Sequence, residues 1–200
     1  MKKFITTISL QGKDLNPVVY TPADSNDLKC DKTVSLPILV TVNNFVESNE
    51  KIIVSPIVIN AESSNSNYEI FKSQLEQIAM EKNFKFELRP IYKELGDTND
   101  VMIKLFADLI ETVSDNDELY ACLTYGTKPI SVITIMALNY AYKIKNNVDI
   151  KKIVYGSGPW EGSRIFDVTP LFYIDSAVNS LAKLKLNNPE DALRSLLGLE

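Results

Sequence analysis

The chain has 200 residues, of which 45% are hydrophobic and 24% charged, and it contains no histidine. This balance is typical of an ordinary folded domain, and the missing histidine excludes Ser-His and Cys-His nucleophile pairs, histidine acid–base catalysis and most zinc hydrolases. The formal net charge of −5 argues against duplex DNA or RNA as a partner of the surface as a whole.

Two cysteines, Cys30 and Cys122, are too few for a disulfide framework or a structural metal site. The N-terminus is basic, but polar residues interrupt the apolar run after it, so the chain start lacks the apolar core of a signal peptide. No apolar stretch reaches the roughly 18 residues that a membrane span needs. We therefore expect a soluble cytoplasmic protein with reduced thiols, no membrane partner, no metal and no cofactor.

Residues 4–10 form a compact β-prone run that predicts the first strand. The next segment is polar and irregular, and a short hairpin is predicted around residues 18–20. Residues 36–45 fit either a strand or a helix, because Ser35 followed by Pro37 looks like a cap and a first helical turn.

Residues 51–60 are apolar almost throughout, which predicts a strand with both faces buried. Pro56 within it predicts a bulge or an edge position, since proline cannot donate to a sheet. The apolar spacing then becomes helical from Tyr68 to Asn83, and residues 84–92 return to strand character.

A second amphipathic helix is predicted over residues 101–113, with cap candidates at 98–100, followed by a strand over 119–125. Residues 129–144 are apolar on nearly every face, which predicts a helix buried in the centre. Residues 153–155 predict a short central strand.

An extended run is expected over residues 165–173, then a helix over 176–186 and a last helix after Pro189. Strands that alternate with helices predict an α/β fold: a Rossmann-like, doubly wound, mainly parallel sheet with helices on both faces. We expect residues 1–175 to form this domain and residues 176–200 to form a C-terminal helical tail that packs on it.

In an open doubly wound sheet, ligands bind beyond the carboxyl ends of the strands, where the strand order reverses. The most informative loop that this rule selects contains Thr124, Tyr125, Gly126, Thr127 and Lys128. A glycine, a threonine cap and an early proline place free amides at a helix N-terminus, which attracts phosphate, and Lys128 adds positive charge. The same residues also fit a plain tight turn, and the spacing of a phosphate-binding P-loop is absent.

The same rule selects the segment after the first strand, with Ser9, Gln11 and Gly12, and residues 60–63. It also selects the loop that contains Gly156, Gly158 and the single tryptophan, Trp160. Glycines around a tryptophan indicate a loop that approaches a ligand closely or stacks on a ring. A surface loop with Trp160 tucked onto the domain is the alternative.

Five segments carry a resemblance to a known family: residues 1–10, 119–130, 137–142, 153–156 and 167–172. In order and spacing they resemble the CARF family, the CRISPR-associated Rossmann-fold sensors of cyclic oligoadenylates in type III antiviral signalling. The resemblance implies a homodimer around a shared pocket, since a cyclic tetra- or hexa-adenylate is symmetric and could present the same contacts to both copies. Cyclic tetra-adenylate is the expected ligand.

The resemblance also implies roles for single residues. Ser9, Gln11, Gly12 and residues 124–128 look like the ligand-contacting segments of the family. If the chain is a ring nuclease, the ribose 2′-hydroxyl attacks the adjacent phosphorus without a metal. Lys128 would then stabilise the phosphate while Ser9 or Thr127 orients it; equally, all three residues would only bind.

Family members usually carry an effector domain after the sensor, whereas this sequence ends at Glu200. Three interpretations remain open: a stand-alone ring nuclease, a sensor that acts on a separate effector, or one domain of a longer protein. Two other classes of function also fit the sequence. One is a non-catalytic regulatory module for another nucleotide or phosphate metabolite, and the other is an interaction domain without a ligand.

Overall fold

The computed structural model describes residues 1–12, 15–158, 162–184 and 186–198. The chain divides into two compact units, Met1–Asp167 and Val168–Glu200. The second unit consists of two helices that contact each other, α5 (Thr169–Leu184) and α6 (Pro189–Leu196). The first unit holds the sheet and every loop that the sequence selected.

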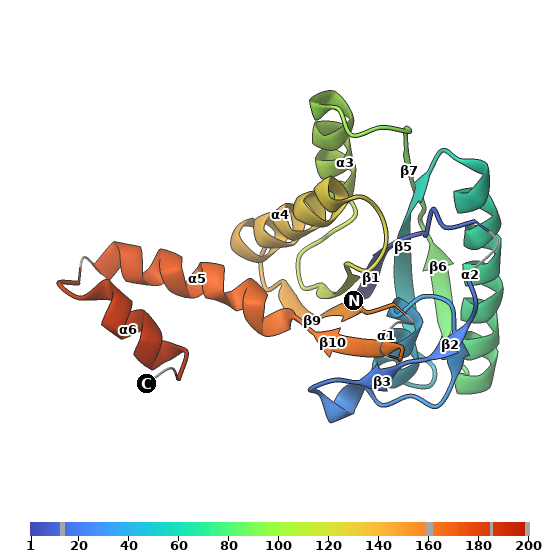
Figure 1. Ribbon diagram of the computed structural model, residues 1–200, viewed down its shortest axis with the longest axis horizontal. Helices are drawn as coiled ribbons and strands as arrows, with labels where there is room; N and C mark the ends of the chain where they lie inside the picture. The colour runs from blue at the N-terminus through green and yellow to red at the C-terminus, as the bar shows by residue number, and fades with distance from the viewer. Residues whose placement is uncertain (13–14, 159–161, 185, 199–200) are drawn as a thin grey trace. The chain divides into compact units, whose positions relative to one another are not determined.

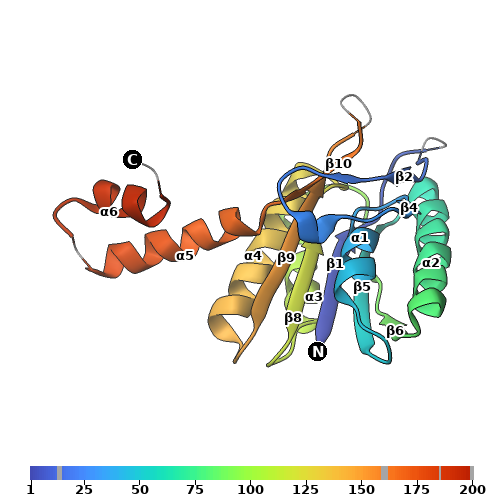
Figure 2. The ribbon, with the colours of Figure 1, turned by 90° about the horizontal axis from the view of Figure 1, so that it is seen from below.

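The central sheet is mainly parallel, and its strand order is that of a doubly wound fold. Across the sheet the strands are β3 (Thr21–Pro22), β10 (Arg164–Asp167), β9 (Asp149–Gly156), β8 (Glu118–Cys122), β1 (Lys2–Thr7), β5 (Lys51–Ile59) and β6 (Lys85–Leu88), with β7 (Ile91–Lys93) also on β5. The chain starts in the middle at β1, builds outward through β5, then crosses to β8 and β9 (Figure 2). The predicted fold class is therefore confirmed, and the strand order reverses beside β1.

Four helices cover the two faces of this sheet. On one face lie α1 (Ile38–Phe45) and α2 (Glu62–Lys82), and on the other lie α3 (Asn99–Glu111) and α4 (Lys128–Ile144) (Figures 1 and 2). The predicted central burial of α4 on nearly every face is wrong. Its side chains at Val132 and Met136 are 58% and 52% exposed, because only one face of this helix packs onto the unit.

The segment between β1 and α1 folds back over the carboxyl end of the sheet. Its β2 (Val18–Val19) pairs with β4 (Thr33–Val34), so the hairpin predicted around residues 18–20 is replaced by a wider pairing. Between these strands β3 pairs with β10, and a short 3-10 helix, η1 (Asn26–Leu28), follows β3. The ambiguous run over residues 36–45 is helical as α1, since its apolar side chains are buried against the core.

Pro56 lies inside β5, next to the edge of the sheet rather than on it. The carbonyl of Val54 accepts a hydrogen bond from Arg89, so alternate residues of β5, including Pro56, face the edge strands. The single predicted strand over residues 84–92 is split into β6 and β7 at this point. The break lies where Pro56 has no N–H to offer.

The two helices predicted at the C-terminus are present as α5 and α6, but the extended run predicted over residues 165–173 is wrong beyond Asp167. Residues 169–173 are the first turns of α5 and not an extended run, because Pro170 is favoured in the first turn of a helix. The boundary that the sequence predicted between residues 175 and 176 falls inside this helix.

Candidate functional site

A cavity of about 440 Å³ lies at the carboxyl ends of β8 and β9, a size within the usual range of ligand pockets. We call it the carboxyl-edge cavity. It is lined by Gln11, Leu15, Asn16, Val18, Tyr20, Thr124, Tyr125, Tyr155, Gly156, Ser157, Gly158 and Ser163. Three separate segments therefore meet there: the segment after β1, the turn after β8, and the ends of β9 and β10.

Thr124 joins the ends of two strands on the floor of this cavity. Its Oγ1 accepts a hydrogen bond from the N–H of Gly156 at 2.7 Å and lies 3.1 Å from the Sγ of Cys122. Burial raises the pKa of the Cys122 thiol, which keeps it neutral. The thiol is therefore a packing group rather than a nucleophile.

Gly156 is the residue that lets the folded-back segment approach the sheet. A Cβ at this position would lie 2.5 Å from the Pro37 Cγ and 3.1 Å from the Tyr20 Cε1. Because glycine has no Cβ, Tyr20 can lie directly over the end of β9. The tight contact explains how a tyrosine distant in sequence comes to line the cavity.

Three tyrosines give the cavity an aromatic wall. Burial and the neighbouring Tyr125 raise the pKa of Tyr20, and burial also raises the pKa of Tyr125. Both phenols therefore stay neutral, and the Tyr125 hydroxyl lies 3.4 Å from the carbonyl of Ser35. Tyr155 is 44% exposed and leaves part of its ring free for stacking on a planar ligand.

The turn from β8 to α4 has the form expected of an anion-binding helix start. Gly126 has a φ of +98°, and a Cβ there would lie 2.9 Å from the Thr7 Cγ2, so the turn lies closely over the end of β1. The N–H groups of Tyr125, Gly126 and Lys128 donate no hydrogen bond to any described residue. Such free amides, with the dipole of α4 behind them, favour a bound anion.

A charged pair formed by β7 and the loop after it lies near the N-terminus of α4. The Lys93 side chain is only 2% exposed, and its Nζ lies 3.1 Å from the Oδ1 of Asp97. Partial burial opposes ionisation of Asp97, but the Thr127 hydroxyl and Lys93 outweigh it and lower the pKa of this carboxyl. Lys93 and Asp97 thus form a charged pair near Thr127, the residue before α4.

Among the predicted site residues, five line the carboxyl-edge cavity: Gln11, Thr124, Tyr125, Gly156 and Gly158. Gly126, Thr127 and Lys128 form the neighbouring turn and helix start, and Lys128 is exposed.

Two further predictions concern the segment after β1. Gly12 lines a separate hollow beside α2. Ser9 is fully buried, and its Oγ accepts the N–H of Gln11 at 3.0 Å, so this hydroxyl shapes the loop and lies outside the cavity.

Trp160 lies outside the described residues. The predictions missed Tyr20 and Tyr155, and also Ser157 and Ser163. Ser157, between two predicted glycines, could have been found from the sequence. Tyr20 could not, because no local pattern shows that its segment returns to β9.

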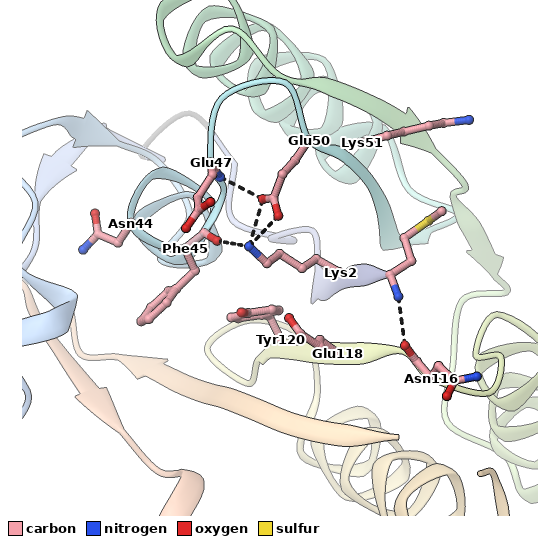
Figure 3. A pocket seen from close by; sticks show the side chains of 10 residues that line it. Lys2, Asn44, Phe45, Glu47, Glu50, Lys51, Asn116, Glu118 and Tyr120 are labelled. Carbon is pink, nitrogen blue, oxygen red and sulfur yellow. Dashed lines mark hydrogen bonds and ion pairs between the residues drawn. The ribbon is translucent and has the colours of Figure 1, made fainter. Parts of the chain in front are cut away.

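A second, larger cavity of about 680 Å³ lies at the opposite, amino end of the strands (Figure 3). Its polar groups satisfy one another. The Lys2 Nζ donates at 2.8 Å to the Phe45 carbonyl and to both carboxylate oxygens of Glu50, and the Met1 ammonium donates to the Asn116 carbonyl at 2.9 Å (Figure 3). Lys51 also lines this cavity, and its Nζ lies 3.8 Å from a carboxylate oxygen of Glu87, so both lysines are paired with glutamates. We assign the candidate site to the carboxyl-edge cavity, because the backbone amides of the neighbouring turn donate to no described residue.

Within the described ranges there is no helix of the length and apolar character needed to cross a bilayer. The described side chains also contain no group of three or more Cys, Asp or Glu placed to hold a metal ion. Comparison with known proteins adds no family to this geometry: no family model matches the chain, and no curated protein matches it significantly.

Proposed function

We propose that this chain binds a cyclic oligoadenylate at the carboxyl-edge cavity and acts as a sensor of that messenger. The observation that carries the proposal is the coincidence of two recognition elements at the point where the strand order reverses. One is the tyrosine wall of the cavity, and the other is the free amides before α4. Aromatic rings stack on bases, and helix-start amides bind phosphate.

The size of the cavity supports a ligand shared between two copies of the chain. A volume of about 440 Å³ suits one drug-sized group rather than a whole four-nucleotide ring. A ring with two-fold symmetry can place equivalent nucleotides in two equivalent cavities of an isologous dimer. A homodimer is therefore part of the proposal.

An exposed row on α4 supplies a surface for that dimer. Lys128, Val132 and Met136 follow one another at four-residue spacing, so they lie along one side of the helix. The two apolar side chains are more than half exposed, and the row begins at the carboxyl edge. A second copy that covers Val132 and Met136 would bring two Lys128 side chains near one ligand.

Sensing is favoured over cleavage by the placement of Ser9. A group that orients a reacting phosphate must reach it, whereas Ser9 is fully buried and bonded within its own loop. The described residues of the cavity also include no basic or acidic side chain. Any cleavage would rest on positioning of the 2′-hydroxyl and on Lys128.

A thermal-shift screen tests the proposal directly, with cyclic tri-, tetra- and hexa-adenylate beside ATP and NAD. We expect cyclic tetra-adenylate to stabilise the protein, because a ligand that binds only the folded state raises its melting temperature. Stabilisation by ATP or NAD alone would instead support a module for another nucleotide. No shift with any of the rings would overturn the proposal.

The stacking part of the proposal is tested by a matched pair of variants. We expect Tyr155→Ala to weaken cyclic tetra-adenylate about tenfold or more, since stacking on one base is worth roughly 1–3 kcal/mol. Tyr155→Phe retains the ring and is expected to bind like the wild type. Tyr92→Ala, which removes an exposed tyrosine from β7, is the control. Equal binding by Tyr155→Ala and wild type would rule out stacking on this ring.

The question of cleavage is answered by chromatography of the incubated ring in the presence of a chelator. We expect the ring to remain intact over many binding lifetimes. If linear products form, Lys128→Ala should abolish or slow their formation. Unchanged cleavage by Lys128→Ala would show that this lysine has no part in the reaction.

A further inference from the structure

The segment after β1 is held in place by two polar side chains of α2. Ser63 Oγ donates to the carbonyl of Leu10 at 3.0 Å. The Nδ2 of Asn67 donates to the carbonyls of Ser9 at 2.9 Å and Gln11 at 2.7 Å. Ser63 and Asn67 are four residues apart, so they project from the same face of α2. Three consecutive carbonyls are thus turned towards one helix.

This arrangement fixes the direction of the amides as well. A trans peptide holds its N–H opposite its C=O, and the described chain contains no cis peptide bond. The N–H groups of Leu10, Gln11 and Gly12 therefore point away from α2. That of Gln11 is used by the Oγ of Ser9, whereas those of Leu10 and Gly12 donate to no described residue.

The loop lies between two hollows. Gln11 and Leu15 line both the hollow beside α2 and the carboxyl-edge cavity. Leu10 and Gly12 do not line the carboxyl-edge cavity, so Gln11 is the residue through which the hydrogen bonds from α2 affect that cavity. Asn67 is 3% exposed and cannot itself reach a ligand in that cavity, so its effect passes through the loop.

We propose that Ser63 and Asn67 are positioning residues of the carboxyl-edge site: by binding three carbonyls of the β1 loop, they hold Gln11 at the wall of the cavity, where its side-chain amide can donate to a phosphate of the ligand. This inference rests on the proposed function. It adds a polar group across the strand-order reversal from the amides before α4. The hydrogen bonds from Ser63 and Asn67 also turn three carbonyl oxygens towards α2, and these oxygens would otherwise repel an anion.

The test uses substitutions on α2 in the full chain, with cyclic tetra-adenylate as the probe. Ser63→Ala removes one donor, and we expect a loss of affinity of about threefold to tenfold, corresponding to one hydrogen bond. Asn67→Asp replaces an amide donor by a carboxylate that faces two carbonyls, and we expect a larger loss. Ser63→Thr keeps the hydroxyl and is expected to restore binding.

A control and a second measurement separate positioning from general damage. Ser66→Ala alters the same helix, but the Oγ of Ser66 donates to the Glu62 carbonyl of its own helix and not to the loop. Its affinity should equal that of the wild type. By ¹⁵N–¹H NMR, the side-chain amide protons of Gln11 should shift downfield when cyclic tetra-adenylate is added to the wild type. The shift should be reduced in Ser63→Ala and restored in Ser63→Thr.

The outcomes distinguish this inference from the proposed function. If the wild type does not bind the ring, the proposed function is overturned and the positioning role falls with it. If the wild type binds, but Ser63→Ala and Asn67→Asp bind equally well with the same Gln11 shift, only the positioning role is overturned. Loss of affinity in the folded variants, rescued by Ser63→Thr, supports both.

Discussion

Gly156 shows how one residue without a side chain determines the shape of the site. Tyr20 and Pro37 occupy the space that a Cβ at this position would need. A side chain there must push the folded-back segment off the end of β9, and with it the tyrosine wall. This glycine therefore couples stability to the geometry of the cavity.

We expect Gly156→Ala to lower the free energy of unfolding by about 1–3 kcal/mol, the usual cost of overpacking a buried site. Chemical denaturation measures this loss, and ligand titration should show weaker binding. Gly12→Ala is the control, because a Cβ there meets nothing within 4 Å. A Gly156→Ala variant as stable as the wild type would contradict the close packing of Tyr20 and Pro37 on this residue.

A second residue-scale feature is the ion-pair cluster around Lys152 on β9. The Nζ of Lys152 lies 2.8 Å from carboxylate oxygens of both Asp27 and Asp167, so it joins η1 to β9 and to the end of β10. Partial burial opposes ionisation of Asp27, but hydrogen bonds from Lys152 and Ser25 outweigh it and lower its pKa. Burial disfavours the charge of Lys152, yet both aspartates raise the pKa of this lysine.

The lowered pKa of Asp27 predicts how stability depends on pH. Its contribution is fully present above pH 3.8, the ordinary pKa of aspartate, and is lost as the pH falls through the lowered value. Asp27→Asn should therefore be less stable than wild type at pH 7, with a difference that shrinks in acid. Urea midpoints at pH 7 and pH 3 measure this, with the exposed Asp31→Asn as control. A difference that does not change with pH would contradict the ion-pair account.

Among the elements of the fold, four strands are each preceded by an asparagine in the left-handed conformation. Asn49, Asn83, Asn116 and Asn147 have positive φ values of 65°, 55°, 61° and 52°, and each stands two residues before a strand of the sheet. They also pair across neighbouring strands: Asn83 Nδ2 donates to Asn49 Oδ1 at 3.1 Å, and Asn147 Nδ2 donates to Asn116 Oδ1 at 3.2 Å. Asparagine tolerates the left-handed conformation better than most residues, which explains its repeated use.

The left-handed conformation of Asn83 predicts that alanine and glycine substitutions lower the free energy of unfolding by different amounts. Asn83→Ala should lower the free energy of unfolding by roughly 1–2 kcal/mol, since alanine is strained at this φ. Asn83→Gly should lose less, because glycine adopts the conformation freely and only the side-chain hydrogen bonds to Ser48 and Asn49 disappear. Asn65→Ala, on the exposed face of α2, is the control. Equal losses for alanine and glycine at Asn83 would show that backbone conformation does not decide the effect.

The α/β class could be predicted, because changes of apolar period mark β1, β5, α2, α3, β8 and α4 along the chain. The break between β6 and β7 could not, since it depends on where Pro56 lies in the sheet. The early start of α5 has a local signal in Pro170, which the prediction of an extended run over residues 165–173 missed.

The residues of the candidate site also differ in whether they could be predicted from the sequence. The turn from Thr124 to Lys128 follows from local residue types, because a glycine, a cap and a proline mark a helix start. Tyr20 and the hydrogen bonds of Asn67 join segments that are far apart in the chain. Asn67, for example, donates to the carbonyl of Ser9, 58 residues earlier. Such contacts depend on the path of the segment between β1 and α1, which has no periodic pattern.

For the whole molecule, the proposal requires two copies around one ligand. We expect the wild type to have twice the chain mass of 22.5 kDa in light scattering. Met136→Glu puts a charge into the apolar row of α4 and should yield monomers that bind the ring weakly, because each then offers half a site. Ile103→Glu, at an exposed apolar residue of α3, should leave the dimer intact. A dimer unchanged by Met136→Glu would place the interface elsewhere.

Isothermal titration of the full chain with cyclic tetra-adenylate tests the central claim most directly, because affinity and stoichiometry come from one experiment. A shared pocket at the carboxyl edge predicts saturable binding of one ring per two chains, weakened by Tyr155→Ala and unchanged by Tyr92→Ala. Binding of one ring per chain would contradict the shared pocket. The absence of any binding heat at several temperatures would contradict the sensor itself.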